Sequence, residues 1–216
     1  MRGQFITLEG IEGCGKTIQI GLLARFFEER AVPCRMTREP GGTAFGREVR
    51  KILLRHDAIK RQPVSELLLY LADRYQHIQE VVLPALSEGL HVLSDRYHDA
   101  TVAYQGFARG IPLATIRSLA DTLELPTPDL TLILDIDVNT GLERARRRNS
   151  SQAVDEFGRF EAEELQFHRQ VREAYHKLAL REPGRMILVP ADGAPEEVCS
   201  RLVAVFEQRG ILPRNT

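Results

Sequence analysis

The chain has 216 residues, of which 43% are hydrophobic and 27% are charged, as in an ordinary globular protein. This composition excludes a disordered, collagen-like or fibrous chain. Lys and Arg total 29 and Asp and Glu total 30, which gives a net charge of -1 at pH 7. The chain therefore has no overall field for capturing nucleic acid or an anionic membrane, and any anion site has to be local.

One α/β domain routinely reaches this length, so we expect residues 1–216 to form a single domain. Cys14, Cys34 and Cys199 are odd in number and widely separated, which argues against a disulfide framework and favours a reducing compartment. The first residues lack the apolar segment of a signal peptide, and no apolar run is long enough to span a bilayer. We therefore expect a cytoplasmic protein with no membrane partner.

Short apolar runs alternate with helical patterns along the chain. This alternation predicts the α/β class, with parallel strands joined by crossover helices. The expected strands lie at 5–8, 32–36, 91–93, 130–136 and 186–189.

Two of the segments between these strands have apolar residues at helical spacing, which predicts helices that face the core. The core-facing residues are expected to be Ile20, Leu23, Phe26 and Phe27 in one helix and Leu67, Leu68, Leu71 and Tyr75 in another.

A glycine-rich sequence directly after the first expected strand matches the phosphate-binding pattern G-x-x-x-x-G-K-[ST]. The glycines let backbone N–H groups turn towards an anion, and the N-terminus of the following helix adds partial positive charge. The lysine supplies a mobile charge, and the final hydroxyl can hold Mg²⁺ beside the phosphates of a bound nucleotide. The residues of this expected ATP-binding loop are Gly10, Ile11, Glu12, Gly13, Cys14, Gly15, Lys16 and Thr17.

Two expected strands end in acids that could contact the same Mg²⁺. Asp95 has the stronger case because Arg96 follows it, so a carboxylate and a cation meet at the carboxyl end of a strand, where such sheets bind ligands. Asp135 and Asp137 are the alternative, and strand-end hydrogen bonding explains them at least as well. We therefore expect Thr17 and Asp95 to hold the metal.

Three classes of phosphate-loop protein can be compared with the sequence. A GTPase is expected to carry an Asn-Lys-x-Asp element that reads guanine, and no Asn-Lys dipeptide occurs. Motor and helicase ATPases are normally larger and need a polymer-binding surface, which the near-neutral charge does not favour. A small kinase fits the sequence better.

Further motifs extend along most of the chain: LEGIEGCGKT at 8–17, TREPGGT at 37–43, DRY at 95–97, AYQG at 103–106, RG at 109–110 and PDLT at 128–131. In these motifs, most of all TREPGGT, the chain resembles the thymidylate kinase family, which phosphorylates dTMP. The resemblance implies the P-loop NTPase fold, a five-stranded parallel sheet with helices on both faces. It also implies ATP with Mg²⁺ as the phosphoryl donor, dTMP as the acceptor and usually a homodimer.

The resemblance assigns residues to the phosphate and sugar of dTMP. Glu12 corresponds to the family's acid near the sugar 3′-hydroxyl. Arg38 and Arg96 correspond to the guanidinium groups that hold the acceptor phosphate, a role that suits their planar pairs of donors. Tyr104 corresponds to the residue that crowds the sugar 2′ position and favours deoxyribose.

Other residues correspond to the family's contacts with the base. Tyr70 and Arg74 lie four residues apart, on one face of an expected helix. Spacing alone favours a core position for Tyr70, whereas the resemblance implies that its ring stacks on thymine while Arg74 hydrogen-bonds a carbonyl of the base. Thr101 and Gln105 lie where the family contacts base or sugar, and Ala100 replaces a frequent serine beside them.

The arginine-rich segment at 144–164 is expected to form a helix, an exposed loop and a second helix. By itself, its basic cluster is typical of a solvated helix face. The resemblance implies that this segment is the lid that closes over ATP. In the bacterial subtype whose phosphate loop has no arginine, the lid carries the catalytic arginine. The phosphate loop of this chain has Cys14 where an arginine would stand. The expected catalytic residues are Lys16, Arg96, Arg148 and Arg159, with Arg144 and Arg147 as substitutes for the last two.

These expectations combine into in-line transfer of a phosphoryl group from ATP to dTMP. Two alternatives stay open. The acceptor could be another nucleoside monophosphate, dUMP or UMP; only the thymine methyl group separates dUMP from dTMP, and a methyl group contributes only about 1–3 kcal/mol in a pocket. The chain could instead be a non-catalytic nucleotide-dependent switch, although a switch has no use for the acceptor arginines Arg38 and Arg96.

Overall fold

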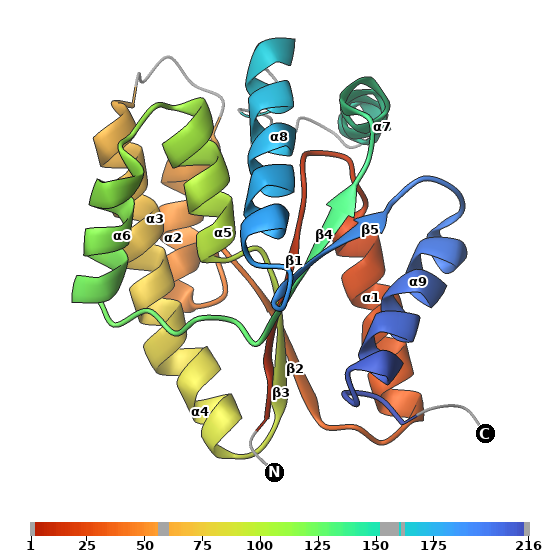
Figure 1. Ribbon diagram of the computed structural model, residues 1–216. Helices are drawn as coiled ribbons and strands as arrows, with labels where there is room; N and C mark the ends of the chain where they lie inside the picture. Colours follow the sequence, from red (N-terminus) through yellow and green to blue (C-terminus); the bar gives the residue numbers. More distant parts are fainter. Residues whose placement is uncertain (1–2, 56–60, 152–159, 161–162, 214–216) are drawn as a thin grey trace.

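The computed structural model describes residues 3–55, 61–151, 160 and 163–213. Its centre is a parallel sheet of five strands in the order β2-β3-β1-β4-β5 (Figure 1). The strands are β1 (Phe5–Glu9), β2 (Cys34–Arg38), β3 (His91–Asp95), β4 (Leu130–Asp135) and β5 (Met186–Pro190). The expected α/β class and the parallel five-stranded sheet are confirmed. Strand β2 begins two residues later than predicted, after Pro33, which has no N–H to donate to a neighbouring strand.

Helices cover both faces of the sheet (Figure 1). Helices α1 (Lys16–Glu29) and α9 (Pro195–Gln208) lie on one face, and α2 (Ala44–Leu54), α3 (Pro63–His77) and α8 (Leu165–Arg181) lie on the other. The connections from β1 to β2 and from β3 to β4 run in opposite directions across the sheet, so right-handed crossovers place their helices on opposite faces. The other helical segments are η1 (Ile78–Val82), α4 (Leu83–Ser87), α5 (His98–Thr101), η2 (Val102–Ala108), α6 (Leu113–Thr122) and α7 (Val138–Ser151), where η denotes a π-helix.

The central strand β1 is buried along its whole length. A strand covered by helices on both faces is expected to be continuously apolar rather than alternating, which explains the run in the sequence. Leu8 pairs with Asp95 of β3, and Glu9 pairs with Ile133 of β4. The carboxyl ends of β1 and β3 therefore lie side by side, and Gly10 begins the phosphate loop beside Arg96.

Helix α3 faces the core with only part of its apolar surface. Leu67 and Leu71 are buried, as expected. Leu68 is 52% exposed and Tyr75 is 44% exposed, so the prediction that they face the core was wrong. Together with Val64 they occupy an outer face of the helix, because positions 64, 68 and 75 recur at helical spacing. Spacing identifies an apolar face but does not reveal what covers it.

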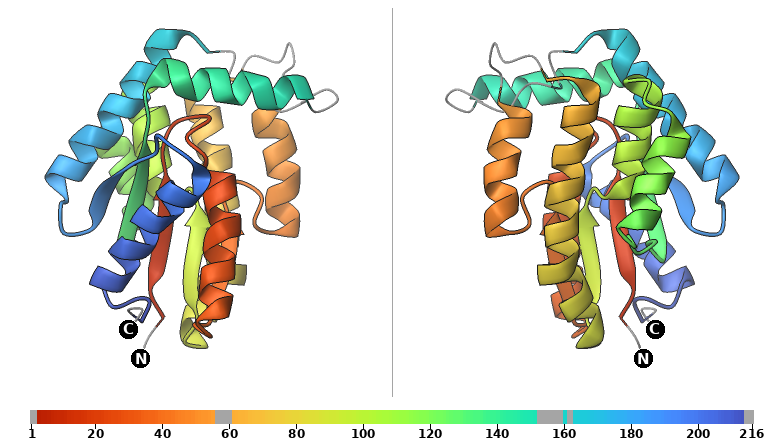
Figure 2. Two further views of the ribbon diagram at one scale, coloured as in Figure 1. Left: turned by 90° about the vertical axis from the view of Figure 1, so that its right-hand side faces the viewer. Right: turned by 90° about the vertical axis from the view of Figure 1, so that its left-hand side faces the viewer.

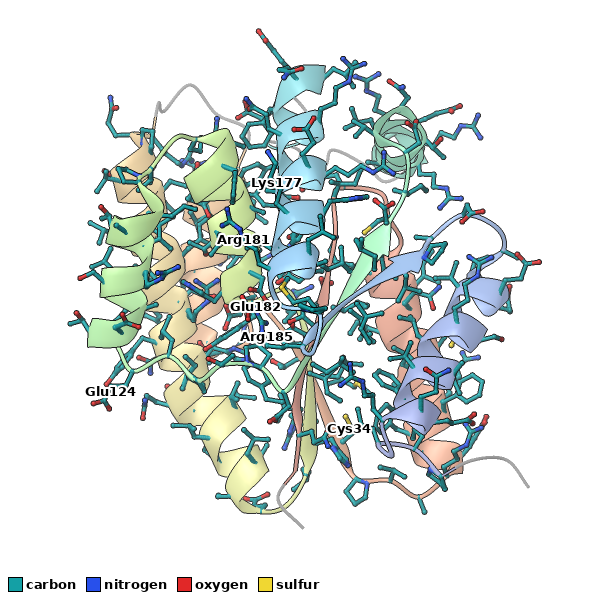
Figure 3. All side chains as sticks on the ribbon, viewed as in Figure 1. Cys34, Glu124, Lys177, Arg181, Glu182 and Arg185 are labelled. Atoms are coloured by element: carbon teal, nitrogen blue, oxygen red, sulfur yellow. The ribbon has the colours of Figure 1, made fainter. Side chains whose placement is uncertain are left out.

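An ion pair between the partly buried Arg185 and the buried Asp99 joins the sheet to the helices beside it. Arg185, just before β5, donates two hydrogen bonds to the carboxylate of Asp99 in α5, at 2.7 and 3.0 Å, and one to Thr131 of β4. It also donates to Glu182 at the end of α8 (Figure 3). Asp99 is buried and the Arg185 side chain is only 14% exposed, so removing one partner would leave the other charge poorly solvated. Arg185 therefore helps to fix α5, which leads into η2, against the sheet.

All three cysteines are free: Cys14 and Cys199 are buried, and Cys34 is half-buried near the start of β2 (Figure 3). Within the described ranges, no helix combines the length and apolar character needed to cross a membrane.

Candidate active site

A cavity of about 770 Å³ lies at the carboxyl ends of β1 and β3. Ligands of parallel α/β sheets bind at this edge, where successive connections diverge. The cavity brings together the predicted residues Glu12, Gly13, Cys14, Gly15, Lys16, Thr17, Arg38, Tyr70, Arg74, Asp95, Arg96, Thr101, Tyr104 and Gln105. The predicted loop residues Gly10 and Ile11 do not line it, but their carbonyl groups face Lys16, as described below.

The phosphate loop requires glycine for two different reasons. Gly10, Gly13 and Gly15 have φ angles of 137°, 70° and 99°, which disfavour residues with side chains. A Cβ atom on Gly13 would also lie 1.8 Å from the carbonyl oxygen of Gly141 in α7. The loop therefore packs backbone to backbone against the first turn of α7.

Lys16 begins α1 and folds back into the loop. Its Nζ atom donates to the carbonyl oxygens of Gly10 and Ile11, each at 3.0 Å, and lies 3.3 Å from Sγ of Cys14. The side chain is buried, and uncharged groups of the loop satisfy its ammonium. This arrangement keeps a positive charge inside the loop, where an anion can exchange with the carbonyl groups.

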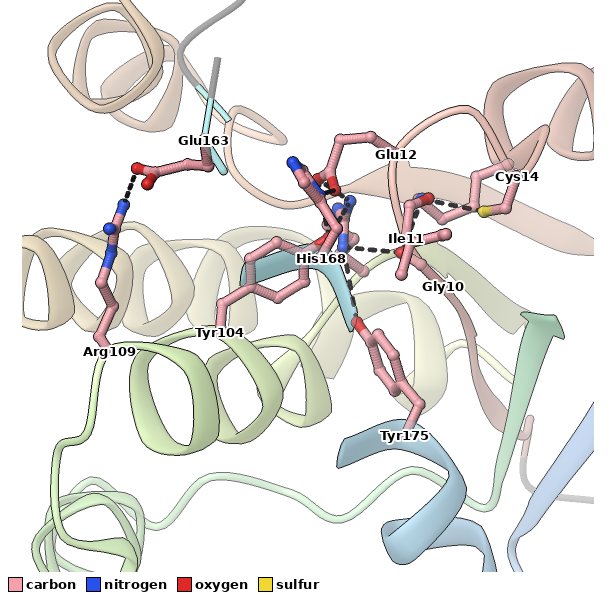
Figure 4. Close-up of polar contacts among 11 residues, drawn as sticks. Gly10, Ile11, Glu12, Cys14, Tyr104, Arg109, Glu163, His168 and Tyr175 are labelled. Atoms are coloured by element: carbon pink, nitrogen blue, oxygen red, sulfur yellow. Dashed lines mark hydrogen bonds and ion pairs between the residues drawn. The ribbon is translucent and has the colours of Figure 1, made fainter. Parts of the chain in front are cut away.

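Arg96 is the centre of a polar network that includes Gly10, Glu12 and Tyr104, which are labelled in Figure 4. One terminal nitrogen donates to the carbonyl oxygen of Gly10 at 3.1 Å. The other donates to Oε1 of Glu12 at 3.0 Å and to the hydroxyl of Tyr104 at 3.1 Å. The Tyr104 hydroxyl in turn donates to Oε1 of Glu12 at 2.7 Å. Three residues predicted for the acceptor side therefore contact one another directly.

The carboxylate of Glu12 is strongly stabilised in its ionised form. Burial by itself raises the pKa of Glu12, but contact with His168 and the charges of Arg96 and Lys16 outweigh burial and lower the pKa to about 2. His168 Nδ1 lies 3.2 Å from Oε2 of Glu12. The sequence did not predict the role of His168, because this residue lies on α8, more than 150 residues after Glu12. The only feature of the sequence that points to His168 is its position among apolar residues at helical spacing.

Arg74 is buried and is held by the protein itself. It donates to Glu39 at 2.8 Å, to the hydroxyl of Thr101 at 2.8 Å and to the carbonyl oxygen of Tyr97 at 3.0 Å. An arginine has five N–H donors, so two remain for a ligand in the cavity. Glu39 also contacts Nδ1 of His77 at 2.8 Å. These partners fix the direction of the Arg74 guanidinium.

A second arginine accompanies Arg38 on the wall formed by β2 and α2. Arg50 also lines the cavity and donates to the carbonyl oxygen of Pro40 at 3.0 Å. Burial and the positive charge of Arg38 lower the pKa of Arg50. Two cationic side chains that line one cavity favour the binding of an anion there. The sequence did not predict Arg50, although its position on the helix that follows TREPGGT was a possible signal.

The acids at the strand ends separate into two groups. Asp95 lines the cavity, and its carboxylate makes no hydrogen bond within the described ranges. Asp135 instead accepts two hydrogen bonds from Arg172, at 2.7 and 2.9 Å. Asp137 accepts from the backbone N–H of Asn139 at 2.9 Å and caps α7. Strand-end hydrogen bonding therefore accounts for Asp135 and Asp137.

The cavity has oxygen ligands suited to Mg²⁺. Thr17 and Asp95 both line it, and Mg²⁺ at nucleotide sites is commonly bound through one or two protein oxygens together with phosphates and water. No group of three or more His, Cys, Asp or Glu side chains able to hold a metal by itself occurs among the described residues. The donor set therefore fits a metal that arrives with a phosphate ligand.

Helix α7 crosses above the carboxyl end of the sheet (Figure 2). Arg144 of this helix lines the cavity and donates to a backbone carbonyl after β5 at 3.2 Å. Arg147 is exposed and pairs with a glutamate one turn earlier. The side chain of Arg148 and all of Arg159 lie outside the described residues. Of Arg144, Arg146 and Arg147, only Arg144 reaches the cavity.

Comparisons with known proteins agree with this geometry. The thymidylate kinase family model matches residues 8–202. A thymidylate kinase from Pelobacter propionicus is 51% identical over 207 residues, which cover 94% of this chain and 93% of that protein. One from Trichlorobacter lovleyi is 48% identical over 212 residues, covering 97% and 99%. The crystal structure of thymidylate kinase from Ehrlichia chaffeensis matches with a TM-score of 0.76 at 29% identity, covering 95% of this chain and all of that one. The chain therefore belongs to the thymidylate kinase family.

Proposed function

We infer that the chain is a nucleoside monophosphate kinase that transfers the γ-phosphoryl group of ATP to dTMP, giving dTDP and ADP. The observation that carries this inference is the presence of two sets of phosphate-binding groups in one cavity. Lys16 and Thr17 belong to the phosphate loop, whereas Arg38 ends β2 and Arg96 follows β3, and all four line the cavity. A switch needs only the first set, whereas phosphoryl transfer has to position a donor and an acceptor phosphate together.

We assign the acceptor end of the cavity to dTMP. Arg38 and Arg96 would hold its phosphate, since guanidinium groups bind phosphate through pairs of hydrogen bonds. Glu12 would face the sugar 3′-hydroxyl, and Tyr104, which contacts Glu12 directly, would crowd the 2′ position. These roles are supported by the direct contacts among Arg96, Glu12 and Tyr104.

We assign the thymine base to the part of the cavity between α3 and η2. Tyr70 would stack on the base, and the two remaining donors of Arg74 could reach a carbonyl group of the ring. Thr101 and Gln105 would contribute further contacts from α5 and η2. Thr101 already accepts from Arg74 at 2.8 Å, and Gln105 donates to a buried glutamate at 2.8 Å, so both side chains are held in place.

We assign the phosphates of ATP to the phosphate loop and its nucleoside to the cavity wall formed by Ile18, Ala191 and Pro195. Thr17 and Asp95 would hold Mg²⁺, which neutralises phosphate charge when it is bound. The side chains of both residues make no hydrogen bond within the described part of the chain, which leaves their oxygens available.

The acceptor oxygen requires no general base. The second pKa of a phosphate monoester is about 6, so the attacking oxygen is largely deprotonated at neutral pH. Catalysis then consists of positioning and charge stabilisation. Lys16 would supply positive charge from the loop and Arg96 from the acceptor side.

We propose that the chain forms a single domain in which the 144–164 segment is the lid. An arginine of this lid would supply further positive charge to the transferred phosphoryl group. The resemblance favours Arg148 and Arg159, and the position of Arg144 in the lining of the cavity supports Arg144 as a further candidate. Arg144→Ala is expected to lower kcat by at least about tenfold, the effect of losing a hydrogen bond to a charged group. Arg147→Ala, on the exposed side of α7, serves as the matched control and is expected to stay within twofold of wild type.

We further propose that the protein acts in the cytoplasm as a homodimer. The three free cysteines support a reducing compartment. Exposed apolar side chains support pairing of two copies through α2 and α3, because an apolar surface of this kind is otherwise unfavourable in water. These side chains are Phe45, Ile52, Val64, Leu68 and Tyr75.

A substitution of the loop lysine tests the proposed function. Lys16→Ala is expected to lower kcat for dTDP formation by at least about a hundredfold, the effect of removing one preorganised charge-stabilising donor. The circular dichroism spectrum should be unchanged, because Lys16 bonds only within its own loop. The matched control, Lys177→Ala, removes a lysine whose side chain is 54% exposed and should keep wild-type kcat. Near-normal turnover in Lys16→Ala would refute the assigned role.

A further inference from the structure

The buried face of α8 carries two polar side chains among apolar ones. Phe167, Val171 and Leu178 are buried on this face. His168 and Tyr175 share it, because seven residues make about two helical turns. Each of them reaches a different glutamate near the carboxyl end of β1. Helix α8 is thus attached to the active site through two polar contacts.

His168 contacts the oxygen of Glu12 that is otherwise unused. Its Nδ1 atom lies 3.2 Å from Oε2 of Glu12, whereas Oε1 is occupied by Arg96 and Tyr104. The histidine side chain is fully buried, and neither ring nitrogen completes a hydrogen bond with the described residues. Unpaired polar atoms in the interior are unfavourable and call for an explanation. The explanation here is electrostatic, since the ring faces the Glu12 carboxylate.

Tyr175 acts on the turn that carries Arg96. Its hydroxyl donates to Oε2 of the buried Glu9 at 2.7 Å, and Oε1 of Glu9 accepts the backbone N–H of Tyr97 at 2.8 Å. Arg96 has a φ of 68°, a left-handed conformation that is unfavourable for arginine. Its own carbonyl oxygen accepts from the hydroxyl of Ser94 at 2.8 Å. The hydrogen bonds from Tyr175 and Tyr97 to Glu9 therefore help to hold this strained turn.

We propose that His168 and Tyr175 are positioning residues for the acceptor site: His168 orients Glu12, and Tyr175 orients Arg96, both through Glu9 and by accepting a hydrogen bond from the Arg96 guanidinium at 3.5 Å. The proposal rests on the proposed function and deepens it. Because both contacts lead to residues of the acceptor end, their loss should reduce use of dTMP. It should leave the affinity for ATP, which binds on the other side of the loop, nearly unchanged.

The first test compares two substitutions of His168. His168→Leu introduces a side chain of similar size that cannot make the polar contact with Glu12. This variant is expected to lower kcat/KM for dTMP by at least about tenfold, with KM for ATP within twofold of wild type. His168→Asn places an amide donor close to the position of Nδ1 and is expected to recover kcat/KM to within threefold of wild type. A His168→Leu protein with wild-type kcat/KM for dTMP overturns the proposal, and so does an Asn variant as impaired as the Leu variant.

Two further variants separate positioning from packing. Tyr175→Phe removes one oxygen atom and provides the test if His168→Leu does not fold; it is expected to lower kcat/KM for dTMP about fivefold or more, again with little change in KM for ATP. Val171→Ala, between the two residues on the same face, should lower Tm but keep kcat/KM for dTMP within twofold. An equal loss in Val171→Ala and Tyr175→Phe overturns the proposal. A wild-type protein that does not turn over dTMP overturns the proposed function and this inference with it.

Discussion

Two glutamates three residues apart experience opposite electrostatic environments at the end of β1. Burial, with the negative charge of Asp99, raises the pKa of Glu9 to about 7 and outweighs the lowering effect of Arg96 and of the two hydrogen bonds that Glu9 accepts. Glu12 is also buried, but His168, Arg96 and Lys16 lower its pKa to about 2. Glu12 differs from Glu9 in its direct ion pair with Arg96 and its contact with His168, and these contacts keep the Glu12 carboxyl group ionised. The ionised one is the glutamate that holds Arg96.

The raised pKa of Glu9 predicts a specific dependence of stability on pH. The folded protein binds an additional proton between about pH 4.5, the ordinary value for this carboxyl, and about pH 7. The free energy of unfolding therefore falls as the pH rises through this window. Glu9→Gln does not titrate, so the unfolding free energy of the variant minus that of wild type should rise across the window. The rise should reach roughly 3 kcal/mol and level off above pH 7.

Urea unfolding at several values between pH 4 and 8 measures this difference. Other shifted groups, such as Asp73 and His98, are present in both proteins, so their contributions cancel in the difference. Glu173→Gln, at a side chain that is 68% exposed, should show no trend with pH. A flat difference for Glu9→Gln would show that Glu9 titrates normally in the folded protein.

Strands, helices and loops could be predicted from the sequence where the residues of the segment itself determine its structure. The strand, phosphate loop and helix at 5–30 have an apolar run, a glycine motif and a helical pattern in direct succession, and the structure agrees with all three. Leu68 and Tyr75 were wrongly expected in the core, because an apolar helical face looks the same in the sequence whether it meets the sheet or the outer surface.

The site residues that the sequence did not predict depend on contacts between elements that are distant in the chain. His168 and Tyr175 lie on α8, and their partners Glu12 and Glu9 are more than 150 residues earlier. Arg50 matters because folding brings α2 next to Arg38. No local pattern encodes these pairings, so the sequence could nominate the phosphate and acceptor residues but not the groups that orient them.

The exposed apolar side chains on the outer face of α3 lead us to expect that two copies of the chain associate through this helix. Leu68→Asp places a charge within the exposed apolar side chains of α2 and α3 and is expected to convert a dimer into a monomer. Light scattering coupled to size exclusion should then give about 24.4 kDa for the variant and about twice that mass for wild type. Leu180→Asp is the matched control, because Leu180 is 81% exposed but lies on α8. A wild-type protein of 24.4 kDa, or a dimeric Leu68→Asp variant, would contradict this interface.

At the scale of the whole molecule, charge is distributed unevenly. The chain carries a net charge of -1, yet its described cavity is lined by six cationic side chains and three acidic ones. A concave site with an excess of one sign of charge concentrates ligands of the opposite sign. The sheet topology produces this excess by bringing loops from distant parts of the chain to one edge. The cations are Lys16, Arg38, Arg50, Arg74, Arg96 and Arg144, and the acids are Glu12, Glu39 and Asp95.

The identity of the acceptor tests the account most directly. ADP and nucleoside diphosphate formation should be measured with Mg-ATP and, separately, dTMP, dUMP, UMP, CMP, AMP and GMP. The account predicts the highest kcat/KM for dTMP, with dUMP roughly tenfold or more lower because it lacks the thymine methyl group. Highest turnover with another monophosphate would contradict the assignments of Tyr70, Arg74 and Tyr104. ATP consumption that no monophosphate changes would contradict phosphoryl transfer itself.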